Sequence, residues 1–123
     1  NNTVYGYGSV AAGGGIGTYG SGVRLTVTDS TVAGNGFYGS GYGGIGGGIG
    51  VIDFSATAVL RVTRTAVSGN TGASFGGGLG VLAGGSVTLT DTQVTGNTAD
   101  TGGGVGVVYN GAFAMTGGRV SGN

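Results

Sequence analysis

An imperfect internal repeat dominates this sequence. A block of three glycines, one aliphatic residue and a fourth glycine occurs four times, and each block is followed by a motif of Val, a small residue, Gly and Asn. The blocks are residues 13–17, 46–50, 76–80 and 102–106, and the second motifs end at Asn35, Asn70, Asn97 and Asn123. A repeat of this kind indicates stacked units, each of which buries its apolar residues against its neighbours.

The spacing of the closing asparagines sets the length of a unit. Successive asparagines are 35, 27 and 26 residues apart, so the core repeat is about 26 residues long and the earlier units carry insertions. The units are residues 13–35, 46–70, 76–97 and 102–123. Residues 1–12 are expected to end a preceding unit, and the insertions at 36–45 and 53–59 are expected to be loops that project from one edge of the stack.

Alternating apolar residues in each unit predict β-strands. Corresponding positions form four apolar rows: Leu25, Leu60, Val87 and Phe113; Val27, Val62, Leu89 and Met115; Val32, Val67, Val94 and Val120; and Ile16, Ile49, Leu79 and Val105. We therefore expect an all-β fold, a right-handed parallel β-helix (β-solenoid) of about four rungs with 26 to 35 residues each, forming one domain over residues 1–123.

The ends of such a column are its weak points. The sequence contains no amphipathic helix to cap either end, so unpaired backbone N–H and C=O groups would be exposed there. We expect continuation, either through further rungs of the same polypeptide or through copies that stack end to end as a fibre.

Composition excludes several classes of function. Charged residues make up only 7% of the chain, with four Arg, four Asp and no Lys, so a basic surface for nucleic acid is not expected. The apolar runs are too short for a membrane-spanning helix, and the absence of Cys excludes disulfides and thiolate metal sites. Two GxGxxG matches, at residues 15–20 and 41–46, are not followed by a helix and arise easily in a glycine-rich chain. We expect no cofactor and no metal.

The glycine blocks and the Val-x-Gly-Asn motifs resemble the GGA[ILV] and FxxN repeats of chlamydial polymorphic outer membrane proteins and related autotransporter-like bacterial surface solenoids. The similarity extends from residue 13 onward, with Gly in place of Ala and Val in place of Phe. The resemblance implies a right-handed β-helix at the cell surface, with an adhesive or structural role and no catalytic residues.

Two rows of polar residues are candidate sites. Asn35, Asn70, Asn97 and Asn123 are expected to form a structural ladder of stacked amides, with ligand binding as the alternative. Thr28, Thr63, Thr90 and Thr116 are expected to face outward, beside a second row of Thr26, Arg61, Thr88 and Ala114. The threonines fit an ordinary pleated surface, a surface that carries O-linked glycans, or an ice-binding surface that Arg61 and Ala114 interrupt.

Charged and aromatic residues supply the remaining candidates. Asp29, Arg64 and Asp91 occupy corresponding positions, so their charges should alternate along the stack and favour the correct register. Tyr38, Tyr42 and Tyr109 could bind sugars or partner proteins, or could pack over the bases of loops. A carbohydrate-active enzyme fragment would require Asp53 or Asp100 to lie near a second carboxylate in a groove.

The function expected from these patterns is that of an extracellular or cell-surface structural or adhesive solenoid, and not an enzyme. Its expected partners are other copies of itself, further rungs of the same polypeptide, or a carbohydrate or cell-surface ligand. A carbohydrate-active enzyme fragment and an ice-binding or glycan-bearing solenoid remain the alternatives.

Overall fold

The computed structural model describes residues 2–7, 11–40, 44–72, 74–82 and 84–123. These residues form an all-β protein without helices, and every pairing between their named strands is parallel. Among the described residues, no helix has the length and apolar character needed to cross a membrane.

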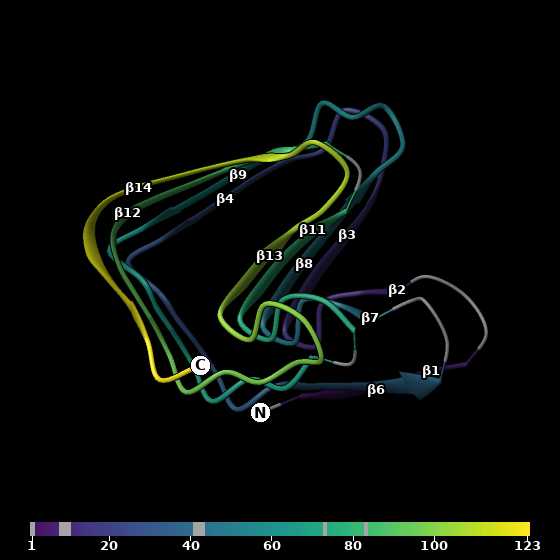
Figure 1. Cartoon of the computed structure of the whole chain (residues 1–123), viewed down its shortest axis with the longest axis horizontal. Helices are drawn as coiled ribbons and strands as arrows, with labels where there is room; N and C mark the ends of the chain where they lie inside the picture. The colour runs from purple at the N-terminus through teal and green to yellow at the C-terminus, as the bar shows by residue number, and fades with distance from the viewer. Residues whose placement is uncertain (1, 8–10, 41–43, 73, 83) are drawn as a thin grey trace.

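Each repeat contributes one strand to each of several stacked faces. The first repeat contains β3 (Ile16–Gly20), β4 (Arg24–Thr28) and β5 (Thr31–Ala33); the second, β8 (Ile49–Asp53), β9 (Val59–Thr63) and β10 (Ala66–Ser68); the third, β11 (Leu79–Leu82) and β12 (Ser86–Thr95); and the fourth, β13 (Val105–Val107) and β14 (Ala112–Ser121). Viewed along the stack, corresponding strands overlie one another and each repeat follows a similar outline (Figure 1).

Two sheets build the walls of this stack. One is four-stranded in the order β13-β11-β8-β3, and the other is six-stranded in the order β4-β9-β12-β10-β5, with β14 also paired to β12. The six-stranded sheet curls because β12 and β14 continue around a corner at which the first two repeats are divided into separate strands. The two walls enclose the apolar core.

The observed registers confirm the predicted apolar rows, and the core also contains Val51, Val81 and Ala58, which the rows did not include. Val67 pairs with Val32 on one side and with Val94 on the other, and Ile49 pairs with Ile16 and Leu79. The fully buried members of these rows are Ile49, Leu60, Val62, Val67, Leu79, Val87, Leu89 and Val94. Because each apolar side chain lies on its counterpart in the next repeat, burial is greatest in the middle of the stack.

The insertion at residues 36–45 differs from the expected loop. It contains β6 (Gly36–Ser40) and β7 (Gly44–Ile45), which pair with β1 (Thr3–Tyr7) and β2 (Ala11–Ala12) and extend to one side of the stack (Figure 1). β1 and β2 therefore take the positions that β6 and β7 take in the next repeat. Only Asn2 lies at the position of a closing Asn.

The glycine blocks make a tight turn and a close backbone contact. The first glycine of each block adopts a left-handed conformation, with φ between 64° and 73°. A Cβ atom on the second glycine of the second block, Gly47, would lie 2.4 Å from the carbonyl carbon of Thr71 and 2.5 Å from the oxygen of Gly77. Glycine is required in these turns because neighbouring backbones leave no room for a side chain.

Candidate functional site

The closing asparagines lie on one continuous row that runs the length of the stack. The Nδ2 group of Asn35 donates to Oδ1 of Asn70 over 3.0 Å, and Asn70 and Asn97 repeat the contact with the next asparagine over 2.9 Å. The backbone N–H groups of Asn2, Asn35, Asn70 and Asn97 each donate to Oδ1 of the next asparagine in the row, which ends at Asn123. Each Oδ1 on this amide row therefore accepts two hydrogen bonds from the preceding repeat.

The Nδ2 groups of Asn70, Asn97 and Asn123 also donate to a carbonyl of the preceding repeat. Nδ2 of Asn70 donates to the carbonyl of Val32 over 2.9 Å, and Nδ2 of Asn97 donates to that of Val67 over 3.0 Å. Both asparagines are fully buried, and no buried side-chain N or O atom in the described part of the chain lacks a partner. The amides of Asn70 and Asn97 are therefore saturated with hydrogen bonds inside the stack, and they hold successive repeats together.

A corner of the sheet carries the predicted charged residues. Asp29, Arg64 and Asp91 all have φ between 46° and 49°, and Gly117 takes the corresponding left-handed position in the fourth repeat. Nε and Nη2 of Arg64 donate to the two carboxylate oxygens of Asp29 over 2.6 and 2.7 Å. These hydrogen bonds lower the pKa of Asp29 and raise that of Arg64, whose pKa the nearby Asp91 also raises slightly.

Hydroxyl groups form an inner row next to this corner, which the sequence analysis did not identify. Oγ1 of Thr65 accepts the N–H of Ser30 and donates to the carbonyl of Thr63 over 2.9 Å. Oγ1 of Thr92 contacts the carbonyls of Val62 and Thr90 in the same region. The signal available in the sequence is the recurrence of Ser30, Thr65 and Thr92 directly after the charged position.

The outward threonines are in register. Thr63 pairs with Thr28 and Thr90, and Thr90 pairs with Thr116. Thr28 and Thr116 are exposed and the two inner members are partly exposed. The neighbouring row places Arg61 between Thr26 and Thr88, so a flat double row of threonines is interrupted.

Asp53 lies at the end of β8 and is fully buried. Its Oδ1 atom accepts the hydroxyl and the backbone N–H of Ser55 over 2.6 and 2.7 Å, and the backbone N–H groups of Gly22 and Val23 donate to its carboxylate from the neighbouring repeat. The hydrogen bond from the Ser55 hydroxyl is the main reason that the pKa of Asp53 falls to about 2, with the backbone donors adding to it against the effect of burial. Asp53 joins two loops.

The aromatic residues lie in different places. Tyr38 and Tyr109 are exposed, and Tyr42 lies outside the described residues. A pair that the sequence analysis did not single out, Tyr19 and Phe54, makes an edge-to-face contact with ring centroids 4.9 Å apart. These two side chains are 66% and 60% exposed, so they form an apolar corner beside the loop that Asp53 holds.

Carboxylates are not gathered into a reactive cluster in the described part of the chain. No group of three or more His, Cys, Asp or Glu side chains suited to a metal ion occurs there. Asp100 is exposed, and the buried Asp53 already accepts its hydrogen bonds from Ser55, Thr57 and two backbone groups.

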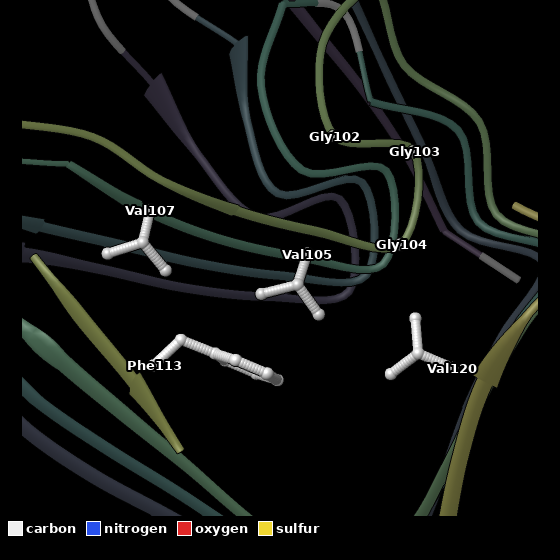
Figure 2. Close-up of a pocket in the computed structure, with 7 residues that line it drawn as sticks. All are labelled: Gly102, Gly103, Gly104, Val105, Val107, Phe113 and Val120. Atoms are coloured by element: carbon white, nitrogen blue, oxygen red, sulfur yellow. The ribbon is translucent and has the colours of Figure 1, made fainter. Parts of the chain in front are cut away.

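The C-terminal end of the stack opens into an apolar hollow of about 440 Å³. Val105, Val107, Phe113 and Val120 point towards this space, beside the turn formed by residues 102–104 (Figure 2). Phe113 is 48% exposed and Val120 is 42% exposed, although their counterparts Val87 and Val94 are buried. The hollow is lined by core residues of the fourth repeat, on which no further repeat packs.

No protein-family model, curated protein or solved structure matches this chain.

Proposed function

We propose that the chain is a right-handed parallel β-helix of about four rungs, without a helical cap, that serves as extracellular or cell-surface structural or adhesive material. The observation that carries this proposal is the amide row, because Asn35, Asn70 and Asn97 each join their repeat to the next through a buried side chain. Buried side chains that hydrogen-bond each repeat to the next suit a protein with a structural role. The right-handed sense follows from the general preference for right-handed crossovers between parallel strands.

The partners proposed for this solenoid are other copies of itself or further rungs of the same polypeptide. The apolar hollow at the C-terminal end supports this proposal, since Phe113 and Val120 would be buried by another rung. A cell-surface location rests on the resemblance of the glycine and Asn motifs to those of bacterial surface solenoids.

An adhesive role is supported by the exposed pair of Tyr19 and Phe54. Aromatic faces stack on the apolar faces of sugar rings, and both side chains are more than half exposed. A carbohydrate ligand is accordingly the class that we propose for this corner.

The alternatives have weaker support. A carbohydrate-active enzyme needs a carboxyl group that can exchange protons, whereas Asp53 has a pKa of about 2 and is surrounded by its own donors. An ice-binding surface needs a flat array, which Arg61 and Ala114 interrupt. Exposed Thr28 and Thr116 leave room for attached glycans.

Electron microscopy of the purified chain at increasing concentrations tests the structural role. We expect rods that lengthen with concentration, and mass spectrometry of the same sample would detect sugars attached to the threonines. Particles of constant size would contradict self-stacking. Retention on immobilised polysaccharides, compared between the unmodified chain and Tyr19→Ala, would test the adhesive role separately, and equal retention of the two would contradict it.

A further inference from the structure

The glycine turns donate hydrogen bonds in one direction only. In the first repeat, the N–H groups of Gly13, Gly14 and Gly15 all donate to carbonyl oxygens of the second repeat, over 2.8 to 3.1 Å. Residues 46–48 donate in the same way to the third repeat, and residues 76–78 to the fourth. An ordinary parallel strand directs its donors and acceptors alternately to its two neighbours. The turns therefore give the stack a direction.

This direction makes the two ends of the stack different. At the C-terminal end, the N–H groups of Gly102, Gly103 and Gly104 have no acceptor among the described residues. At the N-terminal end, the carbonyl oxygens of Gly13 and Gly15 accept no hydrogen bond from the described chain. Their counterparts in the second repeat accept from the first repeat, one hydrogen bond at Gly46 and two at Gly48. One end carries a row of donors and the other carries the matching acceptors.

The amide row has the same direction. Asn97 donates through its backbone N–H and its Nδ2 group to Oδ1 of Asn123, and the backbone N–H of Asn123 has no partner in the described chain. At the other end, Oδ1 of Asn35 accepts two hydrogen bonds from Asn2. The backbone N–H of Asn123 therefore matches the donor position of Asn2, whose acceptor is Oδ1 of Asn35.

The two ends also match in their apolar residues. Phe113 is the last member of the apolar row that begins with Leu25, and Val105 is the last member of the row that begins with Ile16. Leu25 and Ile16 are only partly buried at the N-terminal end and pack against the core from there. If two copies stacked in register, Phe113 of one copy would pack on Leu25 of the next, and Val105 would pack on Ile16.

We propose that the C-terminal end of this chain binds the N-terminal end of a second copy, head to tail and in register. The proposal rests on the structural role proposed above and specifies its partner and its geometry. Residues 102–104 donate to the glycine turn of the incoming copy, and Asn123 takes the place of that copy's Asn2 on the amide row. Two C-terminal ends cannot join in this way because both would bring donors to the same turn.

Cysteine cross-linking tests this geometry directly, because the chain has no cysteine of its own. In the head-to-tail arrangement, Thr116 of one copy lies beside Thr28 of the next, as Thr90 lies beside Thr116 within the chain. Parallel strands are about 4.8 Å apart, which is within the Cα separation that a disulfide spans. Both threonines are exposed, so Thr28→Cys and Thr116→Cys should leave the fold intact.

The two single-cysteine variants are mixed in equal amounts and oxidised. We expect mixed dimers at least about tenfold in excess of the dimers that either variant forms alone. A mixture of Thr63→Cys with Thr116→Cys is the matched control. Thr63 belongs to the same row but lies between Thr28 and Thr90 inside the chain, so it would not lie beside Thr116 of another copy. Deleting residues 1 and 2 should increase the yield by vacating the position that Asn123 requires.

Two results would overturn the proposal. Thr116→Cys dimers as abundant as the mixed dimers would show that C-terminal ends join each other, and the structural role would stand if rods were still observed. A mixed yield no higher than the Thr63→Cys control would show that the ends do not join in register. If rods are absent as well, the structural role fails with it. Val120→Asp in the Thr116→Cys chain should abolish the mixed dimer, because it places a charge in the apolar hollow.

Discussion

Gly48 lies directly against the side-chain amide of Asn70: a Cβ atom at position 48 would be 2.9 Å from Nδ2. The third glycine of every block has this relation to the asparagine that closes the same repeat, at separations of 2.8 to 3.0 Å. The two motifs, although about 20 residues apart in the sequence, therefore form one contact in space. The bare backbone of the glycine allows the amide to lie flat in the row.

Gly48→Ala should destabilise the chain more than Gly69→Ala. A methyl group at position 48 would meet the Asn70 amide and the carbonyl oxygen of Gly78 at 2.7 Å, whereas the space around Gly69 is open. Gly69 has a φ of 59°, so alanine there costs only the left-handed conformation, roughly 1 kcal/mol. Urea denaturation of the two variants measures the difference. Equal losses would show that the contact with Asn70 is unimportant.

Asn70→Ala should cost at least about 3 kcal/mol of unfolding free energy, because it leaves several buried groups without partners. The N–H and Nδ2 groups of Asn35 lose their acceptor, and the carbonyl of Val32 loses its donor. Asn123→Ala is the control, since this asparagine is exposed and water can replace its hydrogen bonds. Denaturation midpoints lowered equally by the two changes would contradict a special role for the buried row.

Asn70→Asp should be as damaging as Asn70→Ala above neutral pH. A carboxylate can still accept from Asn35, but it cannot donate to the carbonyl of Val32 or to Oδ1 of Asn97. Burying its charge adds a further penalty, which protonation relieves. The variant should therefore gain stability relative to the unmodified chain as the pH falls towards 5, measured by thermal melting. A constant difference between pH 8 and pH 5 would argue against a buried carboxylate.

Stability should fall in acid through Asp53. Its pKa is about 2 in the folded chain and near 3.8 when unperturbed, so its contribution is complete above pH 4 and is lost as the pH falls from about 4 to 2. Asp53→Asn should flatten the pH dependence in that window, and Asp100→Asn, an exposed carboxylate, is the matched control. Melting temperatures between pH 2 and pH 6 check this. A slope unchanged by Asp53→Asn would show that other groups control acid unfolding.

Asp29→Asn should lower the stability of the fold only slightly, because both members of the ion pair with Arg64 are exposed. Asparagine tolerates the left-handed conformation at position 29, so this change isolates the charge. The cost should shrink further in about 0.5 M salt, where exposed charges are screened. A loss that is large and independent of salt would show that the pair does more than favour the register.

The apolar rows could be predicted from the sequence because parallel stacking converts a repeat period directly into a register. Val32, Val67 and Val94 recur at equivalent positions, and equivalent positions in stacked repeats become neighbours. The alternation of apolar and polar residues also identified the outward row of Thr28, Thr63 and Thr90. These features depend only on local order along the chain.

Other features required the fold. Residues 36–45 were expected to be a loop because their glycines suggest no strand, yet β6 and β7 within this range pair with β1 and β2, which are far away in the sequence. The contact between Tyr19 and Phe54 likewise joins two repeats at positions that the motifs do not mark. A sequence motif shows which positions recur and says nothing of which side chains meet across a turn.

The sequence alone determined that this protein is built of β-strands, that its units repeat, and which residues stack, since each of these follows from periodicity. Only the tertiary structure decided the direction of the stack and the reason for its glycines. The orientation of the peptide groups at residues 13–15, 46–48 and 76–78 depends on backbone torsion angles and on how closely successive repeats approach. Glycine can adopt the backbone torsion angles that this orientation of the peptide groups requires, and the packing of one repeat on the next selects that orientation.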